Sequence, residues 1–282
     1  MTAPSLYERD GDRYRPHDHA RGPWSAEALH GGPITGLMAH AVEHHVADAE
    51  QFVIVRLLAD LTRPVPNRPL TVHAEITHPG RRLQRVAVSI SCDDVEVSRG
   101  AVIRRRLPTD SSAPADLPGT MRGAYPMPPF PDSTDLAPPF AAAQWTAFHY
   151  EALEYRYVAG TPADPGPATI WARMKGDLVQ GTPVSPVVRA ATISDMGFGF
   201  AWDMTSTGIA MINADVNLNF ARPPRGEWIG VAGHSVVSDL EIGWTDTALF
   251  DRSGTFASVS QSLVGSTSAP WIDDHQGTAA RR

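Results

Sequence analysis

The chain has 282 residues, and its 31 Asp and Glu residues outnumber its 24 Lys and Arg residues, which gives a formal net charge of −7. This acidic balance argues against a dedicated nucleic-acid binder, and a single cysteine, Cys92, excludes an internal disulfide framework and a multi-cysteine metal site. Hydrophobic residues make up 42% of the chain, enough to bury the core of one large domain or two smaller ones.

The polar start of the chain, Met1 to Arg21, lacks the apolar core of a signal peptide. No run of 18 apolar residues occurs, so the sequence predicts no membrane span. With one free cysteine, we expect a protein of the reducing cytoplasm.

The N-terminal part of the chain predicts a hairpin, one helix and four strands. Tyr7 to Arg15 carries an Asp-Gly turn signal between two short runs. His30-Gly31-Gly32-Pro33 is typical of a helix entry, and apolar residues recur at helical spacing from Ile34 to Val42. The strand-like runs that follow are Phe52–Leu61, Leu70–His78, Gln84–Cys92 and Val95–Arg104.

A proline-rich segment then divides the chain. Nine of the 25 prolines lie between Leu107 and Phe140, and proline excludes a helix or a central strand there. We therefore predict an N-terminal repeat at 1–106, a connector at 107–140, a C-terminal repeat at 141–270 and a tail at 271–282.

The second half predicts a similar order of elements. A helix falls within Val187–Met204, weakened by Gly197 and Gly199. The strand-like runs are Tyr150–Tyr157, Ala168–Met174, Ala210–Phe220, Trp228–Ser238, Ile242–Asp251 and Thr255–Val264.

Three segments recur in the same order in both halves. Asp60-Leu-Thr-Arg-Pro matches Asn219-Phe-Ala-Arg-Pro, and we call the difference between residue numbers 60 and 219 the repeat offset. Gly36-Leu-Met-Ala-His matches Thr192-Ile-Ser-Asp-Met, and Val95-Glu-Val-Ser matches Thr255-Phe-Ala-Ser, at nearly the same offset. We interpret the matches as a tandem duplication of one α+β unit, in which a helix buries its apolar stripe against a curved antiparallel sheet.

The chain resembles the double-hotdog acyl-CoA thioesterases, the bacterial thioesterase II-like group. The residues that carry the resemblance are His30-Gly31-Gly32, Thr192-Ile-Ser-Asp195, Asp215 to Pro223 and Asp251 to Gln261. It implies an α+β fold of two tandem hotdog repeats, each a central helix wrapped by a curved antiparallel sheet. It also implies a thioester hydrolase of fatty acid metabolism that cleaves an acyl-CoA without a cofactor.

The resemblance further implies three residues that hold the attacking water. In that group these are an Asp on the second helix, a Thr or similar residue on the strand before the Arg-Pro, and a Gln on the last strand. Asp195 and Gln261 match, whereas Asn213 replaces the usual hydroxyl with an amide that can also donate and accept hydrogen bonds. The equivalents of Asp195 and Gln261 in the first repeat are Ala39 and Ala101, so we expect one active site per chain.

Two further groups are candidates for substrate contacts. His30, Gly31 and Gly32 bring backbone N–H groups to a helix N-terminus, which suits a thioester oxygen, although a plain glycine turn is the alternative. Arginines that could bind the phosphates of coenzyme A, or simply form a solvated strand end, are Arg81, Arg82, Arg85, Arg104, Arg105 and Arg106. His40 and His44 have the spacing of a metal pair but lack a third ligand, so we expect no metal.

Two other functions stay open. One is a non-catalytic acyl-binding protein that kept the pocket and lost the rate. The other is a hotdog hydratase. The resemblance to that class would imply a paired Asp and His on the loop that enters the helix, and the second repeat has no such pair. Because hotdog units commonly associate, we expect a homodimer or higher homo-oligomer.

Overall fold

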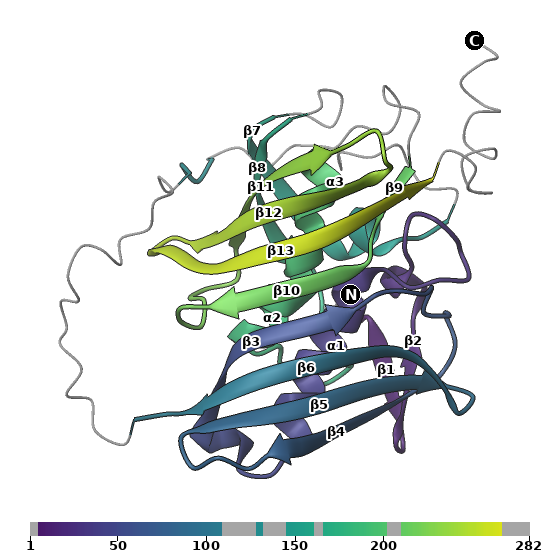
Figure 1. Cartoon of the computed structure of the whole chain (residues 1–282), viewed down its shortest axis with the longest axis vertical. Helices are drawn as coiled ribbons and strands as arrows, with labels where there is room; N and C mark the ends of the chain where they lie inside the picture. Colours follow the sequence, from purple (N-terminus) through teal and green to yellow (C-terminus); the bar gives the residue numbers. More distant parts are fainter. Residues whose placement is uncertain (1–4, 109–127, 132–144, 161–165, 202–209, 267–282) are drawn as a thin grey trace.

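The computed structural model describes residues 5–108, 128–131, 145–160, 166–201 and 210–266 (Figure 1). Most of the predicted connector and all of the predicted tail at 271–282 lie outside these residues. The proposed boundaries at 106, 140 and 270 therefore stay predictions.

The described strands form one 13-stranded sheet in which neighbours along the main path are antiparallel. The order is β1-β2-β4-β5-β6-β3-β10-β13-β12-β11-β8-β7, with β9 paired to β13. Each end of this order is a hairpin, β1–β2 or β7–β8, and four strands follow each hairpin towards the middle. The two sets of four strands meet in the middle of the sheet, where β3 pairs with β10. The strands are β1 (Tyr7–Asp10), β2 (Arg13–Pro16), β3 (Phe52–Asp60), β4 (Leu70–His78), β5 (Leu83–Cys92), β6 (Val95–Arg106), β7 (Leu153–Ala159), β8 (Ala168–Met174), β9 (Ala210–Asn213), β10 (Asp215–Phe220), β11 (Ile229–Val237), β12 (Ile242–Asp251) and β13 (Gly254–Ser266).

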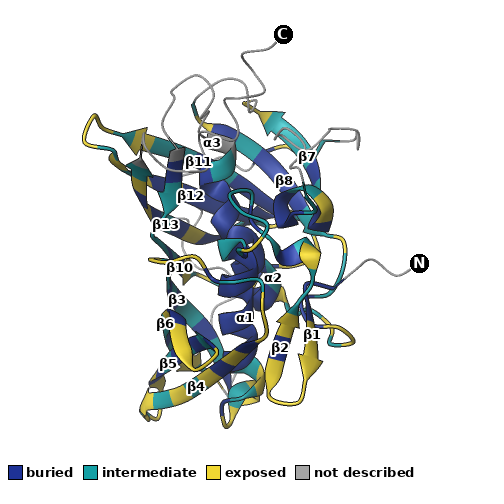
Figure 2. Ribbon diagram, turned by 90° about the vertical axis from the view of Figure 1, so that its right-hand side faces the viewer, coloured by how far each residue is buried: buried dark blue, intermediate teal, exposed yellow. Residues whose placement is uncertain are grey.

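Helices α1 (Gly31–His44) and α2 (Pro186–Ile193) lie inside the curve of the sheet, with the β1–β2 and β7–β8 hairpins on their other side (Figure 2). Most residues of α1 are buried, including the polar Thr35 and His40. The helix is thus enclosed on all sides, whereas the sequence predicted a single buried stripe. No helix in the described part of the chain is long and apolar enough to cross a membrane.

The structure confirms the predicted hairpin, first helix and four strands of the first half, and it corrects three elements of the second. Residues Phe148–Ala152 form a π-helical turn, so the predicted strand at Tyr150 begins only at Leu153. The predicted strand from Ala210 to Phe220 is interrupted at Ala214.

The predicted helix over Val187–Met204 is also divided. After α2 come a 3₁₀ turn, Ser194–Met196, and the short α3 (Gly197–Ala201), and 202–204 lie outside the described residues. Gly197 packs against β12, where an added Cβ would lie 2.0 Å from Thr247 Oγ1. A straight continuation with a larger residue at position 197 has no room at this contact.

Strand pairs have the same register in the two halves of the sheet. Adding the repeat offset to both residue numbers of a pair in the first half gives the residue numbers of a pair in the second. Leu58 lies opposite Asn217 at the central strand pair, and the bulge at Ile90/Ser91 recurs at Leu249/Phe250. At this offset the residue of the first half that is equivalent to Gln261 is Val102, not the predicted Ala101. The predicted match of Val95 to Thr255 is wrong by one residue in the same way. The error matters because a shift of one residue moves a strand side chain to the opposite face of the sheet.

The helices cross through small residues. A Cβ added at Gly36 would lie 2.1 Å from Thr192 Oγ1, and one added at Gly32 would lie 2.4 Å from the Thr192 carbonyl oxygen. Gly36 and Thr192 begin the two helix segments that match each other in the sequence. Only glycine lets the two backbones approach this closely.

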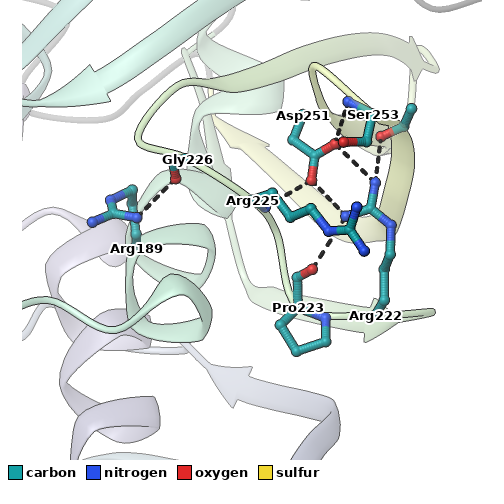
Figure 3. Close-up of polar contacts among 8 residues, drawn as sticks. Arg189, Arg222, Pro223, Arg225, Gly226, Asp251 and Ser253 are labelled. Carbon is teal, nitrogen blue, oxygen red and sulfur yellow. Dashed lines mark hydrogen bonds and ion pairs between the residues drawn. The ribbon is translucent and has the colours of Figure 1, made fainter.

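A buried carboxylate fastens the loop after β10 (Figure 3). Asp251 is fully buried and accepts hydrogen bonds from the Arg222 guanidinium and from the backbone N–H groups of Arg225 and Ser253. Burial by itself would raise the pKa of the Asp251 carboxyl, but these hydrogen bonds hold the pKa below its ordinary value.

We expect Arg222→Gln to lower the free energy of unfolding by about 2 kcal/mol at pH 7, because it leaves Asp251 buried without its charged partner. A carboxyl whose folded pKa is lowered contributes stability above its unfolded pKa of about 3.9 and loses it as the pH falls through the folded pKa. Thermal unfolding of wild type and variant between pH 7 and 2.5 should show the difference in Tm shrinking below about pH 4. The exposed Arg85→Gln serves as control, and a difference that is the same at every pH would contradict the assignment to Asp251.

Candidate active site

Three polar side chains converge on one buried carboxylate. Asp195 lies in the 3₁₀ turn that follows α2 and is only 6% exposed. Asn213 Nδ2 and Gln261 Nε2 donate to Asp195 Oδ1 at 2.7 and 2.9 Å. His30 Nδ1 lies 3.0 Å from Asp195 Oδ2. A carboxylate this deeply buried requires such partners, because its desolvation is otherwise very unfavourable.

Strand pairing brings the two amides to the same place. Asn213 ends β9 and lies opposite Leu263 of β13, and Gln261 is two residues before Leu263 on the same strand. Side chains two residues apart point to the same face of a strand, so Gln261 shares the inner face with Leu263. Gln261 is 2% exposed, as expected for this face.

The glycines after His30 let the N-terminus of α1 approach Asp195. A Cβ added at Gly31 would lie 2.6 Å from both Asp195 Oδ2 and Leu61 Cδ1. The backbone N–H of Gly32 points to His30 Nδ1 at 3.0 Å. The structure thus brings together all six predicted site residues, His30, Gly31, Gly32, Asp195, Asn213 and Gln261.

Sequence reasoning missed the residues behind His30. The π-helical turn places the rings of Phe148 and His149 at 5.0 and 6.0 Å from the His30 ring, between centroids. Burial, and to a lesser extent the neighbouring His30, lower the pKa of His149 to about 3, so the ring is uncharged at neutral pH. The sequence analysis predicted a strand only from Tyr150 onward and assigned no element to Phe148 or His149, so no signal pointed to this packing.

Two amide oxygens of the site are left without partners. Asn213 Oδ1 and Gln261 Oε1 are buried and accept no hydrogen bond from the described residues. Their N–H groups are directed at Asp195, so the oxygens face other directions. A buried acceptor of this kind is unfavourable unless a ligand or solvent molecule donates to it.

The equivalent positions in the first half are apolar. Asn213 lies opposite Leu263 and Ile54 lies opposite Arg104, again related by the repeat offset, so Ile54 corresponds to Asn213. Ala39 and Val102 correspond to Asp195 and Gln261. All three are buried and have no polar side-chain atom, so none can do what Asp195, Asn213 and Gln261 do in the second half. The buried charge of this region is Arg104, which lies opposite Ile54 and donates to Gln84.

The predicted phosphate-binding arginines lie away from Asp195. Arg106 is opposite Phe52 at the start of β3. Leu61, beside Gly31, is nine residues further along, about 30 Å away at about 3.3 Å per residue. Arg104 is also buried, where it donates to Gln84 Oε1 at 2.7 Å and to the Ala47 carbonyl at 2.8 Å. These arginines therefore do not line the site.

The histidines of α1 pack together at a separate place. The rings of His40 and His44 lie 4.2 Å apart between centroids, and His45 Nε2 forms a hydrogen bond with the Tyr14 hydroxyl at 2.8 Å. In the described part of the chain, no group of three or more His, Cys, Asp or Glu residues is arranged to hold a metal ion.

Comparison with known families matches both halves of the chain. Residues 20–105 match the acyl-CoA thioesterase N-terminal domain, and residues 123–264 match the acyl-CoA thioesterase C-terminal domain. No curated protein matches the chain in sequence.

Solved structures with the same fold cover nearly the whole chain. The tesB protein of Mycobacterium avium subsp. paratuberculosis is 17% identical, with a TM-score of 0.66 over 92% of this chain and 95% of that one. The acyl-CoA thioesterase II TesB2 of Mycobacterium marinum is 18% identical, with a TM-score of 0.64 over 92% and 95%. A conserved protein of unknown function with a hot dog fold from Alicyclobacillus acidocaldarius is 13% identical, with a TM-score of 0.70 over 94% and 96%. At these identities the likeness shows the hotdog fold alone.

The equivalent residues of the first half, Ala39, Ile54 and Val102, suggest a stability test of Asp195, Asn213 and Gln261. We expect Asp195→Ala alone to lower the free energy of unfolding by about 1–3 kcal/mol, because two buried amide donors lose their acceptor. The triple variant Asp195→Ala/Asn213→Ile/Gln261→Val, which copies the residues of the first half, should unfold at a higher temperature than the single variant. Calorimetry of both against wild type measures this, and a triple variant less stable than Asp195→Ala would contradict the equivalence.

Proposed function

The chain belongs to the acyl-CoA thioesterase family and is a thioester hydrolase, and we propose that it cleaves an acyl-CoA to the free acid and coenzyme A by water attack assisted by Asp195. The observation that carries the proposal is the buried Asp195 carboxylate between two amides whose oxygens remain free to accept. Asn213 and Gln261 are the proposed partners of Asp195 in holding the water.

This arrangement can orient one water molecule. A carboxylate has about four lone-pair positions, and Asn213, Gln261 and His30 account for three of them. The fourth can accept one O–H of a water molecule, and an amide oxygen of Asn213 or Gln261 can accept the other. Both protons are then held, and a lone pair of the water oxygen is free to attack the thioester carbonyl carbon.

The proposed reaction has two steps. The water oxygen bonds to the carbonyl carbon while its proton passes to Asp195, which acts as general base. The tetrahedral intermediate then collapses, the C–S bond breaks, and the leaving thiolate of coenzyme A is protonated by the acid form of Asp195 or by solvent. The products are the carboxylic acid and the free thiol.

His30 is the proposed switch between two hydrogen-bond patterns. Its Nδ1 lies 3.0 Å from both Asp195 Oδ2 and the Gly32 nitrogen, and one imidazole nitrogen cannot donate and accept at once. With the proton on Nδ1, His30 donates to the carboxylate and the Gly32 N–H is released. That N–H, at the positive end of the α1 dipole, can then stabilise the oxygen on which charge develops during attack.

The tandem architecture is part of the proposal. The palindromic strand order, the constant repeat offset in strand register and the bulges at matching positions support two hotdog repeats fused in one chain, a double hotdog of the α+β class. The site then combines Asp195, Asn213 and Gln261 of the second repeat with His30 of the first. We also propose that the chain acts in cytoplasmic fatty acid metabolism as a homodimer or higher homo-oligomer.

We expect Asp195→Asn to reduce kcat for acyl-CoA hydrolysis by at least about 10²-fold, because an amide cannot accept the water proton. Release of free coenzyme A from a panel of acyl chain lengths, followed with a thiol reagent, measures this. Gln261→Leu should lose rate as well, since it removes a hydrogen-bond partner of the carboxylate.

Equal, slow hydrolysis of every chain length by wild type and Asp195→Asn would instead indicate a non-catalytic acyl-binding protein. Loss of the enoyl absorbance of crotonyl-CoA with wild type would indicate a hydratase.

The role of His30 can be tested through the atom it presents. His30→Ala should lower kcat by about 10²-fold, whereas His30→Asn, whose amide N–H can stand near the position of Nδ1–H, should keep more of the rate. The steady-state kcat of both variants on one acyl-CoA decides this. Equal loss in the two variants would contradict a donor role for Nδ1.

A further inference from the structure

The sequence Arg-Pro follows both central strands, but the two arginines have different partners. Arg63 follows β3, and Arg222 follows β10 at the equivalent position given by the repeat offset. In the second half, the Arg222 guanidinium is bound to the buried Asp251 and also donates to the Gly254 carbonyl at 3.1 Å (Figure 3). Arg222 is therefore a structural residue.

The first half has lost the carboxylate that would bind Arg63. Asp251 lies opposite Gly254 and Cys92 lies opposite Val95, again related by the repeat offset, so Cys92 stands where the second half has Asp251. A buried thiol cannot replace a carboxylate as an acceptor for a guanidinium.

Arg63 is exposed and keeps only a weak local contact. Its Nη1 donates to the Glu96 carbonyl oxygen at 3.3 Å, while the Glu96 carboxylate is taken by Arg99 at 2.6 Å. No carboxylate in the described part of the chain forms an ion pair with Arg63. Its guanidinium has most of its donors available for a ligand.

The position of Arg63 is next to the proposed active site. The Leu61 N–H donates to the Ala214 carbonyl at 2.8 Å, which fixes the end of β3 beside Asn213. Leu61 Cδ1 and Asp195 Oδ2 both lie 2.6 Å from where a Cβ on Gly31 would be. Arg63 is two residues beyond Leu61, so the chain between them spans at most about 7 Å.

Arg222 stands at the opposite end of the sheet. β3 and β10 are antiparallel, so the loop after β10 lies near the start of β3 rather than its end. Arg63, which has no carboxylate partner, is therefore at the end of the sheet that carries Asp195. Arg222 is at the other end, where Ala39, Ile54 and Val102 take the places of Asp195, Asn213 and Gln261.

The chemistry of the substrate gives a reason for this difference. Coenzyme A carries several phosphate charges, and a chain with a net charge of −7 must attract it through a local cation. A guanidinium binds phosphate oxygens through two parallel N–H donors. The acidic neighbours do not compete fully, because Glu96 is paired with Arg99 and Asp215 Oδ1 accepts from the Ser262 N–H at 2.6 Å.

We propose that Arg63 binds a phosphate of coenzyme A and thereby selects substrates carried on that arm. The inference rests on the proposed function, since it assigns a carrier contact to the same site. Arg63 contacts the carrier and takes no part in the chemical step, so it affects KM and leaves kcat unchanged.

The test compares two thioesters of one acyl group, one on coenzyme A and one on N-acetylcysteamine, which has no phosphate. Arg63→Gln should raise KM for the acyl-CoA about tenfold, the value of one charge-assisted hydrogen bond, and leave KM for the N-acetylcysteamine thioester unchanged. Arg63→Lys should lie between wild type and Arg63→Gln. Arg82→Gln, an exposed arginine at the far end of the sheet, is the matched control and should change neither KM.

An unchanged KM for acyl-CoA in Arg63→Gln, or an equal rise for both thioesters, would overturn the proposal. If wild type cleaves neither thioester, the proposed function fails and calorimetric binding of free coenzyme A tests the arginine separately. Weaker binding by Arg63→Gln than by wild type then supports the contact, and equal binding or none overturns it.

Discussion

The rest of the site depends on one buried carboxylate, which needs polar side chains around it. Asp195 is 6% exposed, and a charge at that depth is tolerated only when donors surround it. The side chains that contact it come from parts of the chain far apart in sequence: the residue before α1, the end of β9 and the middle of β13. Glycine at position 31 follows from the same need, because a Cβ there would lie only 2.6 Å from the carboxylate oxygen Oδ2.

The scaffold around this charge is nearly symmetric, and the polar cluster is one of its departures from symmetry. The sheet keeps one register offset through strands and bulges, and the helices cross at Gly36 and Thr192. At one end the carboxylate of Asp195 is bound by amides, whereas at the other end Ala39, Ile54 and Val102 take the equivalent places and the buried charge is that of Arg104.

Much of the fold was accessible from the sequence, since local patterns produced it. Alternating residues predicted the strands of the first half, and the glycine-proline entry predicted α1. The failures have physical causes. The π-helical turn at Phe148 is stabilised by burial rather than by its own sequence. The break at Ala214 corresponds, at the repeat offset, to a bulge between Ile54 and Arg56 of β3. The residue equivalent to Gln261 was predicted wrongly by one position, because a similarity between two strand sequences does not show which face of the strand each side chain occupies.

The sequence by itself predicted a repeated unit from segments that recur in order, and the family resemblance of those segments implied Asp195, Asn213 and Gln261 as site residues. Only the tertiary structure decided how they act together. It brought His30 of the first half against the carboxylate of the second, moved the predicted arginine cluster to the far end of the sheet, and left Arg63 without a carboxylate partner. These three outcomes depend on contacts between segments far apart in the sequence or on strand register across the sheet. A local sequence pattern encodes neither the contacts nor the register.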